Sequence, residues 1–135
     1  MTKKTINKPT ILIVDDDQSL RHALADTFRR ANFTVSEAAD GETGLRQALA
    51  EHPDMILLDL IMPIMDGLTM VKQLRLDPWG RDAQVIILTN LSDVESVAEA
   101  YEQKTYDFLV KTNWTMAAVV QKVKERLRLP TDQTS

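Results

Sequence analysis

The sequence predicts an α/β domain whose parallel sheet is covered by helices on both faces. Three observations predict this fold class: five short β-rich runs recur along the chain, helical patterns alternate with them, and three of the runs are almost continuously apolar. Continuous apolar runs are typical of strands that are buried on both faces of a parallel sheet. Strand–helix units in series are joined by right-handed crossovers, which bring helices to both faces.

The five predicted strands cover residues 10–14, 34–38, 55–60, 84–89 and 106–110. The first, third and fourth are the apolar runs, so we expect them inside the sheet. The second alternates between apolar and polar residues and the fifth contains Asp107, so we expect these two at the edges.

Helical patterns fill the intervals between the strands. Three of them have apolar residues on one face, and the last also has a charged side that we expect in solvent. The apolar positions are Leu20, Leu24, Phe28 and Ala31, then Val94, Val97, Ala98 and Tyr101, then Met116, Val120, Val123 and Leu127; the charged side of the last helix carries Lys122, Lys124, Glu125 and Arg126. Weaker patterns predict helices at residues 42–50 and 68–76.

Local signals agree with this division of the chain. Asp40 before Gly41 opens the second helix, and Asp66 is placed to cap the third. Residues 78–80, Pro-Trp-Gly, predict a turn before the fourth strand.

Length and composition limit the function classes. The chain has 135 residues and a mass of 15.3 kDa, the size of one domain, which we place at residues 9–129 between solvated tails at 1–8 and 130–135. We therefore expect no DNA-binding or catalytic partner module in it. The net charge of −4 argues against direct binding to nucleic acid or to a membrane surface. Cysteine is absent and no apolar run is long enough to span a bilayer, so we expect a cytoplasmic protein without thiol chemistry.

Polar side chains gather where the predicted strands end. Asp15 and Asp16 follow the first strand, Asp59 lies at the end of the third, Thr89 ends the fourth and Lys111 follows the fifth. Parallel sheets bind ligands at this edge, where the strand order reverses. If the order is 2-1-3-4-5, the reversal lies between the first and third strands. The three aspartates would then meet there, with Thr89 and Lys111 beside them.

Three carboxylates in one cleft repel one another, which would raise the pKa of at least one of them. A bound Mg²⁺ would relieve this repulsion, because it prefers oxygen ligands. With a hydroxyl and an ammonium group on its rim, such a site suits a phosphoryl group. Asp59 is the best placed of the three to act as nucleophile and form an aspartyl-phosphate.

Four segments of the sequence resemble the receiver domain of two-component response regulators. They are residues 11–17 (ILIVDDD), 57–67 (LLDLIMPIMDG), 87–89 (ILT) and 108–111 (FLVK). The resemblance extends over about residues 9–129 and implies a flavodoxin-like (βα)₅ fold with strand order 2-1-3-4-5. It also implies a switch that accepts a phosphoryl group on Asp59 from a histidine kinase or histidine phosphotransfer protein, and that then changes its binding face for a downstream protein. Such a domain catalyses only its own phosphotransfer and dephosphorylation, and it is a monomer or a weak homodimer through the last helices.

The same resemblance implies the ligands of Mg²⁺. Asp16 would bind the ion directly, and Asp15 would act mainly through a metal-bound water. Asp59 and the backbone carbonyl of Ile61 would complete the set.

It also implies how the switch works. Thr89 would move to bond a phosphoryl oxygen, and Lys111 would pair with the phosphoryl group. Phe108 would turn inward as Thr89 moves, which is a population shift between two packings.

Three other functions fit the sequence less well. A pseudo-receiver that binds its partners without phosphorylation is disfavoured by the intact set of acids, threonine and lysine. A flavin- or nucleotide-binding protein of the same fold is disfavoured because no glycine-rich phosphate loop follows the first strand. An independent phosphatase that uses an aspartyl-phosphate would need a cap insertion or a second general acid near Asp59.

Some residues have simpler interpretations. We expect Asp17 to cap the first helix. His22 and His52 lack acid–base neighbours in the sequence, so we expect both in solvent. Trp79 and Trp114 are either anchors for a partner or part of the loop packing.

The chain also departs from the usual receiver pattern. Thr112 stands where proline usually follows the lysine, Asn90 where a small residue follows the threonine, and Lys104 where glycine precedes the fifth strand. These departures predict an atypical output face. Ile61 and Leu91 are apolar at positions that, in the family that the sequence resembles, influence attack by water on the phosphoryl group, so the resemblance predicts a long-lived aspartyl-phosphate.

Overall fold

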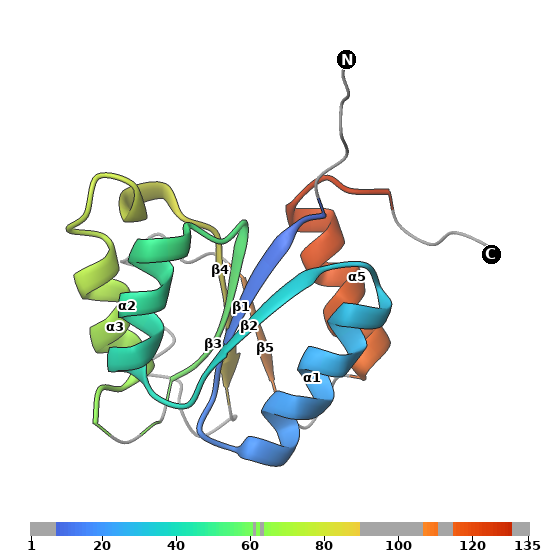
Figure 1. Ribbon diagram of the computed structural model, residues 1–135, viewed down its shortest axis with the longest axis horizontal. Helices are drawn as coiled ribbons and strands as arrows, with labels where there is room; N and C mark the ends of the chain where they lie inside the picture. The colour runs from blue at the N-terminus through green and yellow to red at the C-terminus, as the bar shows by residue number, and fades with distance from the viewer. Residues whose placement is uncertain (1–7, 61, 63, 90–106, 111–114, 131–135) are drawn as a thin grey trace.

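Five parallel strands form one sheet in the computed structural model, which describes residues 8–60, 62, 64–89, 107–110 and 115–130 (Figure 1). The strands are β1 (Thr10–Val14), β2 (Thr34–Ala38), β3 (Met55–Asp59), β4 (Val85–Thr89) and β5 (Asp107–Val110). Their order is β2-β1-β3-β4-β5. The predicted fold class and strand order are therefore confirmed, and the second and fifth strands lie at the edges as expected.

The third and fourth strands are each one residue shorter than predicted. Leu60 leaves the sheet because its carbonyl accepts a hydrogen bond from the amide of Gly67, at 2.8 Å. Gln84 lies just before β4, although its carbonyl still accepts a hydrogen bond from the amide of Ile56, at 2.9 Å. The pattern of polar and apolar residues alone does not predict where these two strands begin and end.

The helices cover both faces of the sheet (Figure 1). On one face lie α1 (Gln18–Arg30) and α5 (Met116–Arg126); on the other lie α2 (Gly41–Glu51) and α3 (Gly67–Leu74), followed by the short 3₁₀ helix η1 (Gly80–Asp82). Asp40 and Asp66 cap α2 and α3 as predicted, because their carboxylates accept hydrogen bonds from the amides of Thr43 and Thr69, both at 2.8 Å. The third helix ends two residues before the predicted position 76, and the predicted helix at 94–101 lies outside the described residues.

Two apolar cores lie on opposite faces of the sheet because successive side chains of a strand point in opposite directions. In β1, Leu12 and Val14 pack toward α2 and α3, whereas Ile11 and Ile13 pack toward α1 and α5. All five residues of β3 are buried, which explains its continuous apolar sequence up to Asp59. The two cores hold β1 and β3 from both sides and so fix the positions at which these strands end.

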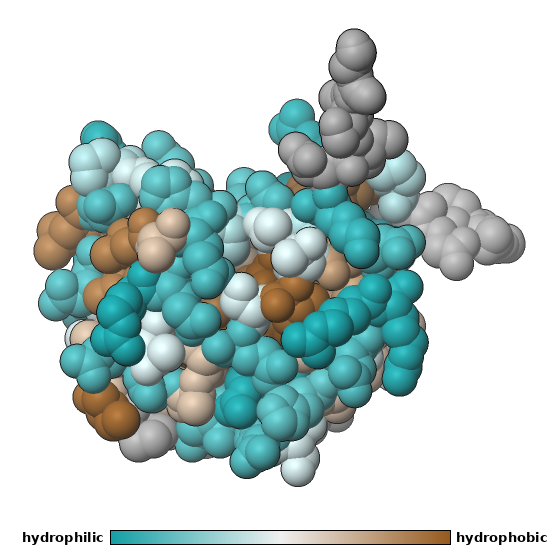
Figure 2. Space-filling model, viewed as in Figure 1, coloured by the Kyte–Doolittle hydropathy of each residue, from teal (hydrophilic) through white to brown (hydrophobic). Residues whose placement is uncertain are grey.

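The surface of the molecule on the side seen in Figures 1 and 2 is mainly hydrophilic, and its apolar side chains form small separate areas (Figure 2). The charged side of α5 differs from expectation at Arg126. This residue is half-buried and donates a hydrogen bond to the side-chain oxygen of Gln84, at 2.9 Å, so it joins α5 to the start of β4 instead of facing solvent. None of the helices in the described part of the chain has the length and apolar character needed to cross a membrane.

Candidate functional site

The ends of β1 and β3 bring the acidic residues together. Val14 pairs with Leu58 in the sheet, so Asp15 and Asp59, the residues that follow them, reach the same edge side by side. Leu88 pairs with Asp59, and Thr89 pairs with Val110 at the same edge. The strand order reverses between β1 and β3, which is where open parallel sheets bind their ligands.

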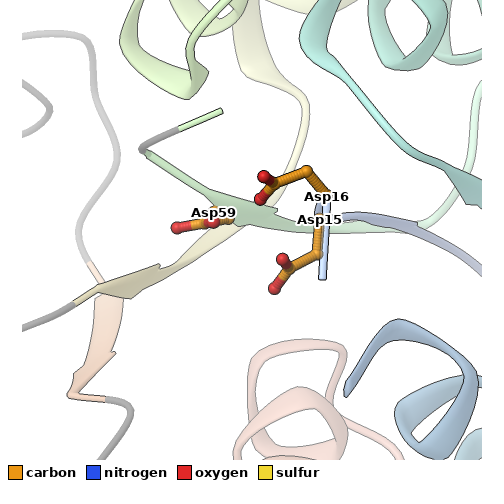
Figure 3. Close-up of side chains that lie close together, drawn as sticks. All are labelled: Asp15, Asp16 and Asp59. Carbon is orange, nitrogen blue, oxygen red and sulfur yellow. The ribbon is translucent and has the colours of Figure 1, made fainter. Parts of the chain in front are cut away.

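Three carboxylates form a cluster at this edge. One carboxylate oxygen from each of Asp15, Asp16 and Asp59 lies within 4.8 Å of the other two, and Figure 3 shows the three side chains at the ends of β1 and β3. Asp15 is fully buried and Asp59 is 5% exposed, whereas Asp16 is exposed to solvent. The site therefore has a closed floor and an open rim through which a ligand can approach.

Hydrogen bonds hold the first part of the cluster in place. The amide of Asp15 donates to the carbonyl of Ala38 on β2, at 3.1 Å, and the carboxylate of Asp15 accepts from the amide of Asp17, at 2.9 Å. The carboxylate of Asp17 accepts from the amide of Leu20, at 3.1 Å, and so caps α1. The capping interpretation of Asp17 is confirmed, and of this acidic triplet only Asp15 and Asp16 join the cluster.

Gly67 holds the second part of the cluster. Its amide donates to the carbonyl of Leu60, and a Cβ atom at this position would lie 2.3 Å from the carbonyl oxygen of Asp59. Only glycine therefore lets α3 begin this close to the end of β3. The loop from Asp59 to Gly67 is closed by this contact.

Sequence reasoning missed Arg21 and Glu37. Arg21 donates from Nη1 to the backbone carbonyl of Asp15, at 2.9 Å, and from Nε to the carboxylate of Glu37 on β2, at 3.0 Å. The only signal available in the sequence was an arginine one turn into the first helix and an acid one residue before the end of the second strand. Neither stands out among the charged residues of the chain.

The two histidines take different positions. His22 is exposed as expected, but the expected lack of an acidic neighbour is wrong, because its Nε2 lies 3.4 Å from a carboxylate oxygen of Glu37. Glu37 is distant from His22 in the sequence, so no local pattern could reveal the pair. His52 is exposed and stacks on Trp79, with ring centroids 4.3 Å apart and planes at 8°. Trp79 also packs against the apolar core on the α2–α3 face, which fits the loop-packing interpretation.

The remaining predicted site residues are described only in part. The backbone of Thr89 ends β4 and that of Phe108 lies in β5. Ile61, Asn90, Leu91, Lys104, Lys111, Thr112 and Trp114 lie outside the described residues.

The cluster fits a hard divalent cation. Carboxylate oxygens are the ligands that Mg²⁺ prefers, and two oxygens on opposite sides of an octahedral Mg²⁺ lie about 4.2 Å apart. Oxygens already within 4.8 Å of one another reach this spacing through small side-chain movements. The buried Asp15 and Asp59 would supply charge at the floor of such a site, and the exposed Asp16 would supply it at the rim.

Comparisons with known proteins agree with this geometry. The chain is 37% identical over 123 residues to the transcriptional regulatory protein PrrA of Mycobacterium leprae, a match that covers 91% of this chain and 52% of PrrA. The chain thus spans about half the length of this curated relative. A crystal structure of a putative response regulator from Chloroflexus aurantiacus is 31% identical, with a TM-score of 0.82 over 90% of this chain and 99% of that one. The chemotaxis protein CheY4 of Vibrio cholerae is 27% identical, with a TM-score of 0.81 over 88% and 98% of the two chains.

The family model of the response regulator receiver domain matches residues 11–124. This range includes the buried residues of both apolar cores, all strand residues except Thr10 of β1, and every residue of the acidic cluster. The chain belongs to the response regulator receiver domain family, whose members are the signalling domains of two-component systems.

Proposed function

We propose that this receiver domain is a phosphorylation-dependent switch in which Asp59 accepts the phosphoryl group. The observation that carries the proposal is the convergence of three carboxylates within 4.8 Å at the ends of β1 and β3. Asp59 lies at the centre of the sheet edge, at the end of a fully buried strand that holds its backbone in place. A nucleophile needs such positioning because small displacements slow a transfer reaction strongly.

Mg²⁺ is the cofactor in this proposal. Asp15, Asp16 and Asp59 would hold it, together with the backbone carbonyl of Ile61. When bound, the ion offsets the negative charge of the carboxylates and of the incoming phosphoryl oxygens. The burial of Asp15 and Asp59 supports this assignment, because a cation stabilises carboxylates that lie side by side away from water.

The phosphoryl donor is a phosphohistidine of a histidine kinase or of a histidine phosphotransfer protein. One oxygen of Asp59 attacks the phosphorus atom; a phosphorus–oxygen bond forms as the phosphorus–nitrogen bond breaks, and the leaving imidazole takes up a proton. In the reverse half of the cycle, water attacks the phosphorus atom and releases inorganic phosphate and the Asp59 carboxylate. The domain thus acts on its own side chain and turns over no separate metabolite.

The response to phosphorylation involves three further residues. Thr89 donates a hydrogen bond to a phosphoryl oxygen, Lys111 pairs with the phosphoryl group, and Phe108 turns inward as Thr89 moves. The phosphoryl group favours the active packing only through its stronger contacts in that state. The change reaches a downstream protein at the output face, with no direct contact to nucleic acid or membrane. The domain works in the cytoplasm as a monomer or a weak homodimer through its last helices.

PrrA is named a transcriptional regulatory protein, and the match covers only half of it. A role of this domain in the control of transcription is therefore part of the proposal. A net charge of −4 supports a protein partner in preference to a direct contact with DNA.

Intact-mass measurement after incubation with acetyl phosphate and Mg²⁺ tests the proposal. We expect the wild type to gain one phosphoryl group and Asp59→Ala to gain none. Asp17→Asn is the matched control, because asparagine retains the cap on α1 and Asp17 lies outside the cluster; it should be labelled like the wild type. Labelling of Asp59→Ala, or none of the wild type, would reject Asp59 as the acceptor. Partner binding that is unaffected by beryllofluoride would then favour the phosphorylation-independent pseudo-receiver.

A further inference from the structure

Arg21 connects the acidic cluster to the edge strand of the sheet. Its guanidinium donates to the backbone carbonyl of Asp15, at 2.9 Å, and to the carboxylate of Glu37, at 3.0 Å. The Arg21 side chain is only 12% exposed and that of Glu37 only 22%, so water competes weakly for this bridge. Arg21 therefore joins the start of α1, the end of β1 and β2 at one point.

The bridge completes the support of the Asp15 backbone. The amide of Asp15 donates to the carbonyl of Ala38, and Ala38 follows Glu37 directly on β2. The amide and carbonyl groups of Asp15 are thus both held from the same strand, one directly and the other through Arg21. The residue cannot rotate about its backbone without breaking one of these contacts.

This support matters most for Asp16. Within the described part of the chain, no hydrogen bond to the Asp16 carboxylate occurs, and the side chain is exposed. Its position in the cluster therefore depends on the backbone between Asp15 and Asp17. If that backbone is loose, a cation has to order it on binding, and the ordering costs affinity.

We propose that Arg21 is a positioning residue that sets the affinity of the acidic cluster for Mg²⁺ by holding the Asp15 carbonyl against Glu37. The inference rests on the proposed function, in which the cluster binds that ion. Some residues do not bind a metal themselves but orient the groups that do. Their removal typically lowers metal affinity by about 10–100-fold. The arginine fork is needed because it presents two donors with fixed geometry, one for each acceptor.

Glu37 offers a matched control on the same surface. Arg29 also approaches its carboxylate, with Nη2 at 3.5 Å from Oε2, but among the described residues Arg29 has no contact with Asp15. Arg21→Ala and Arg29→Ala each remove one positive charge that faces Glu37. Only Arg21→Ala removes the hydrogen bond to the backbone carbonyl of Asp15. Comparison of the two variants therefore separates the positioning of Asp15 and Asp16 from a general effect of charge.

Isothermal titration of the folded protein with Mg²⁺ alone tests the proposal. We expect Arg21→Ala to raise the Kd by about tenfold or more, Arg21→Lys to raise it by nearly as much, and Arg29→Ala to change it by less than about twofold. Glu37→Gln keeps an oxygen acceptor for Arg21 and should stay close to the wild type. If Arg21→Ala does not fold, Arg21→Lys, which keeps the charge but not the fork, provides the same comparison.

Hydrogen exchange gives a second measurement that does not depend on the ion. The amide of Asp17 donates to the Asp15 carboxylate, so it should exchange faster in Arg21→Ala than in Arg29→Ala. Equal Kd values and equal exchange in the two alanine variants would overturn the positioning role of Arg21. Failure of the proposed function looks different: the wild type would then bind no Mg²⁺, or Asp16→Ala would bind it as tightly as the wild type.

Discussion

Replacing Gly67 by alanine tests the contact that places Asp59. A Cβ atom built on Gly67 would lie 2.3 Å from the carbonyl oxygen of Asp59 and 2.8 Å from the Cα atom of Leu60. Both are backbone atoms of the buried end of β3, so neither can turn aside as a flexible side chain would. The beginning of α3 must therefore move away from the strand.

The size of this movement sets the expected cost. An ordinary contact of about 3.4 Å or more requires a shift of roughly 1 Å, which lengthens the hydrogen bond from Gly67 to Leu60 beyond a useful distance. Overpacking costs about 1–3 kcal/mol, and a buried backbone group without its partner costs about 1–3 kcal/mol. Alanine recovers up to about 1 kcal/mol through its higher helix propensity. We therefore expect Gly67→Ala to lower the free energy of unfolding by about 2–4 kcal/mol.

Urea unfolding followed by circular dichroism measures this loss. With an m-value near 1.5 kcal/mol/M, the unfolding midpoint should fall by about 1–3 M. The control is Gly44→Ala in the interior of α2, where the new Cβ would meet side-chain atoms of Val14 at 2.9 Å and the sulfur of Met70 at 3.2 Å. The backbone is not displaced here, but Val14 is buried and stiff, so overpacking of about 1–3 kcal/mol less about 1 kcal/mol of helix propensity leaves an expected loss of about 0–2 kcal/mol, smaller than for Gly67→Ala. A Gly67→Ala midpoint equal to that of the wild type would show that the backbone contact does not restrict this position.

Three further predictions concern the acidic site and the residues around it. Ile64 is 78% exposed and has φ of 69°, a conformation that asparagine adopts more easily than a β-branched residue, so Ile64→Asn should raise the free energy of unfolding by about 0.5–1 kcal/mol; Leu76→Asn, at an equally exposed position without positive φ, should not. Polar residues in place of both Ile61 and Leu91 should shorten the lifetime of the phosphorylated protein, and an unchanged rate of phosphate release would reject their role. Asp59→Asn should stabilise the protein in EDTA by about 1 kcal/mol or more, because it removes one of three like charges whose ligand oxygens lie within 4.8 Å of one another. Mg²⁺ should reverse the order of the two unfolding midpoints, and a wild type that remains the less stable of the two in Mg²⁺ would contradict the assigned ligands.

Most of the fold could be predicted from the sequence because each element carries its own local signal. The apolar runs of β1, β3 and β4 indicate burial on two faces, and the polar positions of β2 and the acid in β5 indicate the edges. Asp40 and Asp66 mark helix starts through a hydrogen bond within three residues, which a sequence motif can represent. The end of β3 could not be predicted as well, because a hydrogen bond from the more distant Gly67 to the carbonyl of Leu60 decides it.

The candidate site was predictable only where strand ends supply its residues. Asp15, Asp16 and Asp59 each follow an apolar run, and the strand order brings those ends together. Arg21 and Glu37 were not predictable, because their contact joins the first helix to the second strand and depends on how α1 lies against β2. The same reason explains the wrong expectations for His22 and Arg126, whose partners are distant in the sequence. Periodicity shows which face of a helix is buried, but it does not show which polar side chains meet across elements.

The apolar cores hold the acidic cluster in place, but the cluster does not itself stabilise the fold. Asp15 and Asp59 extend from two strands that are held on both faces by apolar side chains, and close approach of their charges opposes folding. The apolar cores must therefore be stable enough to offset this repulsion. Because the strands are already fixed, a cation or a phosphoryl group has to order little of the protein when it binds. More of the binding free energy can then favour the active packing of the switch. The one part of the cluster outside the cores, the loop at Asp16, depends on Arg21 for the same support.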